Sequence, residues 1–363
     1  MTSALRVAIV GASQRPTAYA SINRVWVAEL TRLGIDARLV ASAADLDGRF
    51  DRVIHHDYHD YFGDLCRPDT GRFIAVLTWD FGPYPQRWVD VVHNVCDELW
   101  VYSRWTAEQA IASGVEASKV VVMPHGVDTE VLTPYGPRYR FDGGVPAGDP
   151  DRFVFLFVGA AIARKGVDIL LAAFGRAFEV GDAVSLVIKD HSRDVFYQGV
   201  GLRDRIEAFQ ARPGAPDLLY IDAYLDAARL AALYRSADAG VFPFRAEGFA
   251  MPILEAMACG TPSIIPRFGP CLDFCDDRTS YFVPARRIRL PIGRALQFNT
   301  LGFREDVAEV DFCEVDPAVL AAEMRRVVSV GAEARAQVRL AAAEKARAFS
   351  WRASVDRIRE RLL

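Results

Sequence analysis

The sequence has few cysteines for its length and no long apolar run, and each shortage excludes a class of protein. Six cysteines in 363 residues are too sparse for the disulfide framework of a small secreted domain, so we expect reduced and mostly buried thiols. Cys271 and Cys275 could begin a zinc site, but no second pair follows at zinc spacing, which favours a structural role. No run of about 18 apolar residues occurs, and the N-terminus lacks the pattern of a signal peptide. These features predict a soluble, cytoplasmic protein.

The chain also lacks a strong excess of charge of either sign. It has 43 basic and 47 acidic residues, which gives a net charge of −4, and the two signs are interspersed. This pattern excludes a nucleic-acid-binding face and a disordered acidic tail. No basic amphipathic helix of the kind that docks on anionic bilayers is evident, so membrane association is not expected. The length predicts two domains, each with its own core.

Short apolar runs alternate with helical patterns, which predicts parallel sheets covered by helices. In the first half, RVAIV (6–10), FIAVLT (73–78) and ELWVYS (98–103) each precede a helical stretch. The pattern restarts with FVFLFVG (153–159), whose continuous apolar character fits a strand that is buried on both faces. Between the two halves, residues 133–150 are rich in proline and glycine, and we predict a linker there.

The stretch EGFAMPILE (247–255) places a carboxylate at each end of an otherwise apolar turn. Pro252 suits the first turn of a helix, and Gly260 with Pro262 ends it, so we predict a helix from Pro252 to about Cys259. Glu247 then lies in the loop before the helix, where Gly248 permits a tight turn, and Glu255 lies about one turn into it.

A helix N-terminus offers unpaired N–H groups and partial positive charge, which favour phosphate. Carboxylates beside such a site are consistent with a ligand that carries both phosphates and hydroxyls, as a nucleotide sugar does. Arg164 and Lys165 follow the strand at 153–159, at the sheet edge where ligands bind in open α/β folds. Arginine can pair with two phosphate oxygens and lysine adds a point charge, so this pair is a candidate for the diphosphate.

Three segments in this order resemble the retaining GT-B glycosyltransferases of glycosyltransferase family 4. They are SRWTAEQAIASGVEASKVVVMPHGVD, FLFVGAAIARKGVDILLAAF and ADAGVFPFRAEGFAMPILEAMACGTPSII, and the resemblance spans nearly the whole chain. It implies an α/β GT-B fold, with two Rossmann-like doubly wound domains facing across a cleft. The expected domains are an acceptor domain at 1–135, a donor domain at 151–330, and a helical segment at 331–363 that packs back towards the first domain.

The resemblance implies transfer of a sugar from a nucleoside-diphosphate sugar to a hydroxyl acceptor, with retention of configuration and without a metal or other cofactor. Glu255 would bind the donor ribose, and Glu247 would contact the hydroxyls of the transferred sugar or support the site. Arg164 and Lys165 would neutralise the departing phosphate. The backbone N–H groups of the next segment would meet the sugar and the diphosphate; its residues are Gly248, Phe249, Ala250 and Met251.

The chain departs from many relatives at two positions. It has Ala160 where an arginine is common, so we assume that Arg164 takes its place. After the strand FIAVLT it has Asp80 in the neighbourhood where a histidine is common. Asp80 could orient the acceptor hydroxyl or take its proton, and it could equally cap the following segment.

Two other motifs, at 54–64 and at 11–13, are candidates for a part in binding. IHHDYHDYFGD (54–64) holds three of the six histidines, but adjacent histidines point apart in an extended segment, which favours a loop near the acceptor over a metal site. The turn from Gly11 to Ser13 has one glycine where a dinucleotide fingerprint needs three, so we place it beside the cleft on the acceptor side. A nucleotide-sugar epimerase or phosphorylase of the same fold, and a non-catalytic sugar-nucleotide-binding subunit, remain alternatives.

Overall fold

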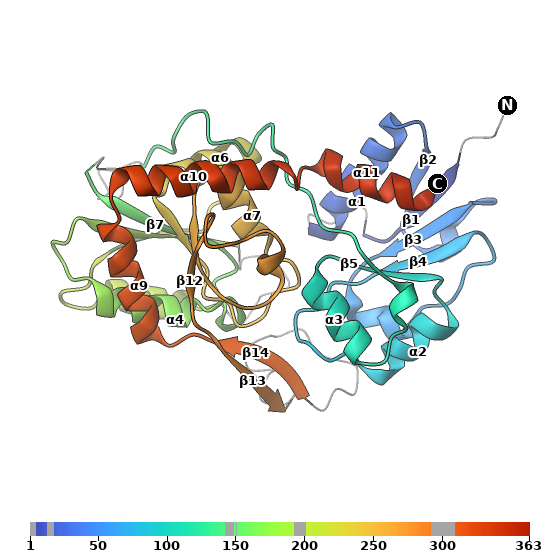
Figure 1. The fold of residues 1–363 in the computed structure, drawn as a ribbon, viewed down its shortest axis with the longest axis horizontal. Coiled ribbons are helices and arrows are strands. Elements are labelled where there is room, and N and C mark those ends of the chain that lie inside the picture. The colour runs from blue at the N-terminus through green and yellow to red at the C-terminus, as the bar shows by residue number, and fades with distance from the viewer. Residues whose placement is uncertain (1–4, 13–17, 142–148, 150, 192–200, 292–308) are drawn as a thin grey trace. The chain divides into compact units, whose positions relative to one another are not determined.

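The computed structural model describes residues 5–12, 18–141, 149, 151–191, 201–291 and 309–363. The chain divides into two compact units. The first contains Met1–Gly126 and Phe349–Leu363, together with 303–308, which lie outside the described residues. The second contains Val127–Gly302 and Glu309–Ala348. Each unit has a sheet of its own, and we describe each separately (Figure 1).

The sheet of the first unit has six parallel strands in the order β2-β1-β3-β4-β5-β6. The strands are β1 (Arg6–Val10), β2 (Asp36–Val40), β3 (Arg52–His56), β4 (Arg72–Val76), β5 (Glu98–Val101) and β6 (Val120–Val122). The helices are α1 (Ala18–Arg32), α2 (Gln86–Asn94), α3 (Arg104–Ala112) and α11 (Trp351–Leu362), with short 3-10 turns η1 (Ala43–Asp45), η2 (His59–Asp64) and η3 (Ala117–Lys119). The winding direction reverses between β1 and β3, which is the topological switch point of a doubly wound sheet.

Helix α11 belongs to the first unit although it follows the second unit in the sequence. It packs against α1, and its residues Val355, Ile358 and Leu362 are fully buried (Figure 1). The Ser354 hydroxyl donates a hydrogen bond of 2.7 Å to the carbonyl of Pro124. A β-carbon on Gly126 would lie 2.4 Å from the Cα atom of Trp351, so only glycine fits where the chain leaves the first unit.

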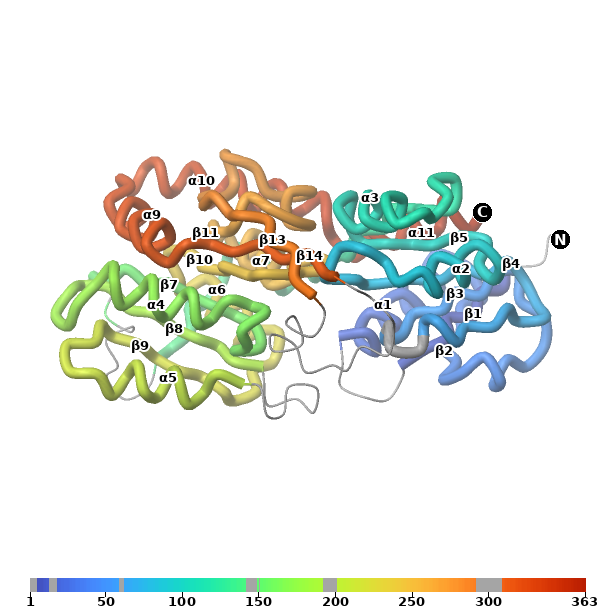
Figure 2. Tube along the Cα trace, turned by 90° about the horizontal axis from the view of Figure 1, so that it is seen from below, coloured from blue at the N-terminus to red at the C-terminus, as the bar shows by residue number. Residues whose placement is uncertain are grey.

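The second unit repeats the parallel architecture in the order β12-β11-β10-β7-β8-β9. Its strands are β7 (Phe153–Gly159), β8 (Val184–Asp190), β9 (Asp217–Ile221), β10 (Ala239–Val241), β11 (Ser263–Pro266) and β12 (Tyr281–Val283). Its helices are α4 (Val167–Ala177), α5 (Arg203–Gln210), α6 (Ala227–Ser236), α7 (Met251–Ala258), α9 (Pro317–Ser329) and α10 (Ala332–Arg347). Figure 2 shows β8 between β7 and β9, with α5 beside β9. An antiparallel pair, β13 (Arg286–Pro291) and β14 (Glu309–Glu314), lies outside this sheet.

The strand at 153–159, predicted from its continuous apolar residues, lies in the core of the second unit. Every residue of β7 and of β8 is buried, including the polar Ser185 and Lys189. The predicted α/β class with two Rossmann-like, doubly wound units is therefore confirmed.

All six cysteines are free thiols and five are buried, with Cys66 exposed. No helix among the described residues is long and apolar enough to cross a bilayer.

The predicted linker is wrong for its described part, residues 133–141. These residues pack on α6, where the Arg235 guanidinium donates hydrogen bonds to the carbonyls of Thr133 (3.1 Å) and Pro137 (2.9 Å). The Tyr139 N–H also bonds the Ala232 carbonyl, at 3.0 Å. Proline and glycine therefore mark an irregular segment held by side-chain donors, and the units divide earlier, after Gly126.

Candidate functional site

The candidate site lies at the switch point of the second sheet. The chain winds outward from β7 through β8 to β9, and then returns to place β10 on the opposite side of β7. The segments that follow β7 and β10 therefore meet at the carboxyl edge, where open α/β sheets bind ligands. After β7 comes the 3-10 turn η6 (Ala163–Lys165), and after β10 comes the loop 242–250 that leads into α7.

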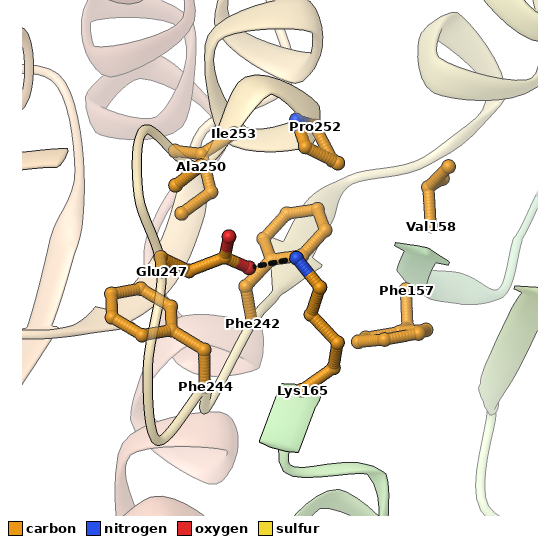
Figure 3. Close-up of a pocket in the computed structure, with 9 residues that line it drawn as sticks. All are labelled: Phe157, Val158, Lys165, Phe242, Phe244, Glu247, Ala250, Pro252 and Ile253. Carbon is orange, nitrogen blue, oxygen red and sulfur yellow. Dashed lines mark hydrogen bonds and ion pairs between the residues drawn. The ribbon is translucent and has the colours of Figure 1, made fainter. Parts of the chain in front are cut away.

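An ion pair joins these two segments. Lys165 Nζ contacts Glu247 Oε1, and the two side chains are only 16% and 10% exposed (Figure 3). Burial in an apolar setting strengthens such a pair, because little water competes with it. The prediction that these two residues, 82 positions apart, share one site is therefore consistent with the structure.

The pair lines a small pocket, whose cavity of about 10 Å³ has room for roughly one water molecule or one hydroxyl group. The lining consists of Phe157, Val158, Lys165, Phe242, Phe244, Glu247, Ala250, Pro252 and Ile253 (Figure 3). Apolar walls that surround a few charged groups are typical of small-molecule sites. The pocket thus presents one cation and one carboxylate beside the start of α7.

Gly166 allows η6 to approach the second loop closely. Its φ is +76°, and a β-carbon there would lie 1.9 Å from the carbonyl oxygen of Pro243. Any other residue would push the two segments apart and separate Lys165 from Glu247. The glycine is therefore required by the geometry of the site.

Helix α7 starts at Met251, one residue before the predicted start, and ends at Ala258. Pro252 lies in its first turn, as predicted. Pro252 has no N–H, and the Ile253 N–H already donates a 3.1 Å hydrogen bond to the Ala250 carbonyl, so this helix end offers a ligand its partial positive charge and the N–H of Met251. Ala250 precedes it with φ +70° and ψ +48°, in the left-handed region.

The loop before α7 is rigid because its residues are buried and bonded. Each residue from 242 to 250 is buried, including Gly248, and Phe249 packs on Phe274 with ring centroids 5.4 Å apart. Arg164, only 6% exposed, donates a 3.0 Å hydrogen bond to the Ala246 carbonyl. Arg164 therefore supports the loop, while its neighbour Lys165 lines the pocket.

Arg245 fixes the same loop from its other side. Its guanidinium pairs with both oxygens of Asp168 on α4 (2.8 and 2.9 Å) and with both oxygens of Glu314 on β14 (2.8 and 3.0 Å). Its backbone N–H bonds the Arg164 carbonyl at 2.8 Å. One buried arginine thereby holds together the two segments that carry Lys165 and Glu247.

Glu255 lies one turn into α7, as predicted, and is hydrogen-bonded to a residue of α6. The Tyr234 hydroxyl donates a 2.8 Å bond to Glu255 Oε2, and Tyr234 is fully buried. Burial raises the pKa of the Glu255 carboxyl to about 7, although the bond from Tyr234 favours the ionised form. Glu255 is not among the residues that line the pocket of Figure 3.

The acceptor-side residues lie in the first unit. Gly11 directly follows β1 at the first switch point with φ +151°, and a β-carbon there would lie 2.1 Å from the His56 carbonyl oxygen. Asp80 follows β4 and is half-buried. Burial, with a smaller contribution from the Asp80 charge, raises the pKa of the Tyr19 phenol. Ser13 lies outside the described residues.

The histidines of IHHDYHDYFGD fill structural positions where they are described. His56 is fully buried, with Nδ1 2.5 Å from Asn23 Oδ1 and Nε2 in contact with the Tyr102 hydroxyl. Burial lowers its pKa well below the usual value. Among the described residues, no group of three or more histidine, cysteine or acidic side chains could hold a metal ion. The side chain of His59 is not described.

The sequence analysis missed Tyr234 and Arg245. Tyr234 lies 21 positions before Glu255 in a helix that reads as ordinary core, and nothing in its own segment indicates a partner. For Arg245, the one signal in the sequence that could have indicated a role in the site was its position two residues before Glu247, beside the motif EGFAMPILE. The partners of Arg245 are set by strand order, which brings residues 69 to 82 positions apart into contact.

Comparisons with known proteins agree with the geometry. Residues 144–287, which contain the pocket and α7, match the family model of glycosyl transferases group 1. The chain is 33% identical over 156 residues to the D-inositol 3-phosphate glycosyltransferase of Arthrobacter sp. (strain FB24), covering 41% of this chain and 34% of that protein. It is 30% identical over 246 residues to the protein of the same name in Geodermatophilus obscurus, covering 67% and 47%. The chain thus spans half or less of the length of these relatives.

A solved structure shares the fold over nearly the whole chain. Anabaena HepE in complex with UDP and glucose superposes with a TM-score of 0.67, and the match covers 99% of both chains at 13% identity. At that identity the likeness shows the fold alone. It extends the match beyond residues 144–287 to both units.

Proposed function

We propose that the protein is a retaining glycosyltransferase that transfers a sugar from a nucleoside-diphosphate sugar to a hydroxyl of a saccharide or small natural product. The observation that carries the proposal is the buried Lys165–Glu247 pair beside the N-terminus of α7. It provides a cation and a carboxylate within one pocket, beside the partial positive charge at the start of α7. A diphosphate with attached sugar hydroxyls requires these three features.

The residues divide the donor between them. Lys165 and the Met251 N–H at the start of α7 would bind the diphosphate, with Arg164 fixing the loop behind them. Glu247 would accept hydrogen bonds from the hydroxyls of the transferred sugar, and Glu255 would accept them from the ribose. Before the donor binds, Lys165 and Glu247 neutralise each other; the donor's phosphate and hydroxyl groups would replace that contact.

The reaction breaks the bond between the anomeric carbon and the diphosphate oxygen and forms a bond from that carbon to the acceptor oxygen. The acceptor proton passes to the departing diphosphate, on the same face as the attack, which retains the configuration. Lys165 and the α7 N-terminus stabilise the negative charge that develops on the leaving group. Positioning and this electrostatic stabilisation supply the rate, so the proposed reaction requires no metal.

Asp80 is the candidate residue for the acceptor. It follows β4 at the carboxyl edge of the first sheet and is half-buried. A carboxylate there can orient a hydroxyl by accepting its hydrogen bond. Gly11, which follows β1, would lie on the same side, and the sequence predicts the same for Ser13.

Calorimetric titration with UDP-, GDP-, ADP- and TDP-sugars tests the proposal, with Lys165→Met beside the native protein. We expect one clear binder, weakened roughly 10- to 100-fold in Lys165→Met, because a hydrogen bond to a charged group contributes about 1.5–3 kcal/mol. Lys345→Met is the matched control: it removes a half-exposed lysine of α10 that pairs with Asp276 at 3.7 Å.

Three outcomes would contradict the proposal in different ways. No binding by any nucleotide sugar at millimolar concentration would overturn the site itself. Binding without transfer to any of a panel of hydroxyl acceptors would favour a non-catalytic subunit. Release of an epimerised sugar nucleotide, or of a sugar phosphate, would favour the epimerase or phosphorylase alternative.

A further inference from the structure

Ala250 has an unusual backbone conformation for its residue type. Among the described residues it is the only non-glycine residue with positive φ (+70°). The left-handed region brings a β-carbon close to the following carbonyl oxygen, so it favours glycine. Alanine is therefore a costly choice at this position, and the backbone gives no reason for it.

The capping role of Ala250 gives no reason either. Ala250 is the residue that precedes α7, and its side chain makes no hydrogen bond to the helix. Serine, threonine, aspartate, asparagine and glycine are all preferred over alanine there. Both local preferences thus oppose a methyl group, and strain that persists in a binding loop points to a use for the strained residue.

The methyl group of Ala250 lines the pocket. Ala250 is 3% exposed, and Figure 3 shows it beside Ile253 on the α7 side, facing Glu247. The cavity is only about 10 Å³, so a single methyl group on its wall decides whether more than a hydroxyl group fits beside the carboxylate. It narrows the pocket at the carboxylate that would accept the sugar hydroxyls.

We propose that the Ala250 methyl group determines which donor sugar the protein accepts. It admits sugars with an unsubstituted hydroxyl at the position facing Glu247 and rejects those with a bulky group there, such as an acetamido group. This inference rests on the proposed function, because it assigns Glu247 to the transferred sugar. Differences of about one methyl group in a pocket typically change selectivity 10- to 200-fold.

The test compares UDP-glucose with UDP-N-acetylglucosamine, and uses UDP as a probe that lacks the sugar. We expect native protein to bind UDP-glucose at least tenfold more tightly than the acetamido donor. Ala250→Gly should reduce that ratio at least tenfold, by strengthening the binding of the acetamido donor. Ala250→Asn, which tolerates the left-handed region, should weaken both sugar donors more than it weakens UDP.

A matched control separates selectivity from packing. Ala258→Gly removes a buried methyl group from the last residue of the same helix, which is not among the residues lining the pocket. It should lower the melting temperature without changing the donor ratio. Ala250→Gly should not lower the melting temperature, because glycine relieves the strained φ.

Each alternative result has a distinct meaning. If native protein binds none of the three probes, the proposed function and this inference are overturned together for UDP donors. If native protein selects UDP-glucose and Ala250→Gly selects it equally well, only the inference is overturned. An equal loss of melting temperature in Ala250→Gly and Ala258→Gly would show that the methyl group serves packing.

Discussion

Glu255 is an acid that the fold holds in a partly neutral state. Burial raises its pKa from 4.5 to about 7, and Tyr234 supplies the hydrogen bond that limits the shift. The folded protein therefore holds this proton more tightly than the unfolded chain does. Stability is highest below the unfolded pKa and is lost as the pH rises from about 4.5 through 7. This loss of stability on ionisation is consistent with a binding role for Glu255, because the ionised carboxylate is the form that accepts hydrogen bonds from hydroxyl groups.

Glu255→Gln should therefore stabilise the fold at high pH. The substitution removes the ionisation and keeps an oxygen for the Tyr234 hydroxyl, so we expect a gain of about 1–3 kcal/mol at pH 8 and almost none at pH 5. Urea unfolding at the two pH values measures it, with the exposed Glu344→Gln as control. A gain that is the same at both pH values would contradict the assigned pKa shift. The same variant should bind the nucleotide-sugar donor markedly more weakly.

At the scale of secondary-structure elements, Arg245 connects η6, α4, β14 and the loop before α7. It is 6% exposed, and its partners Asp168 and Glu314 are 22% and 32% exposed, so the cluster lies at the margin of the core. Removing the arginine would leave two carboxylates near each other without a counter-charge. Buried ion pairs contribute little net stability when intact, but they are costly to break.

Arg245→Met should destabilise the protein and weaken the donor site together. We expect a loss of about 2–4 kcal/mol in the free energy of unfolding, below the fully buried limit because both carboxylates retain some solvent. Donor affinity should fall because η6 and the loop of Glu247 are no longer held together. Arg326→Met provides the control, since Arg326 is 55% exposed and pairs with Glu323 on the same helix, which predicts a loss under about 1 kcal/mol. Equal losses in the two variants would contradict the role of Arg245.

The sequence predicted those elements whose signals are local. The strand at 153–159 is continuous in apolar residues, and Pro252 with Gly260 bounded α7 to within one residue at each end. Lys165 was predicted from its position after the strand at 153–159, and Glu247 from its place in the loop before a helix N-terminus. The Tyr234–Glu255 bond and the conformation of Ala250 could not be predicted, because they depend on how α6 and the loop pack. The proline and glycine content of 133–141 was a misleading signal for a linker. Composition does not reveal that Arg235 donates hydrogen bonds to carbonyls of this segment.

At the scale of the whole molecule, the first unit is built from two separate parts of the chain. Residues 1–126 supply the sheet, and α11, more than 200 positions later, covers part of it through Val355, Ile358 and Leu362. The Ser354–Pro124 hydrogen bond and the Arg361–Glu98 ion pair (3.0 Å) reinforce the contact. The second unit is complete without α11.

Ile358→Asp should therefore destabilise the first unit selectively. A carboxylate placed in the apolar contact with α1 should cost at least about 3 kcal/mol, while nucleotide binding by the second unit at low temperature stays within twofold of native. Differential scanning calorimetry and a nucleotide titration measure the two effects. Arg357→Asp, one position away on the exposed face of α11, is the control and should leave the calorimetric trace unchanged. Loss of nucleotide affinity in Ile358→Asp would contradict the expectation that the second unit binds nucleotide independently of the first.

The place of α11 in the chain also affects folding during synthesis. Domains generally fold as they are made, from the N-terminus, at about 5–20 residues per second. The sheet of residues 1–126 must therefore wait for roughly 10–50 s, while the entire second unit is translated, before α11 exists to cover it. Throughout that interval, the surface that later receives Val355, Ile358 and Leu362 is open to other apolar segments. We therefore expect the nascent chain to depend on chaperones more than the finished protein does.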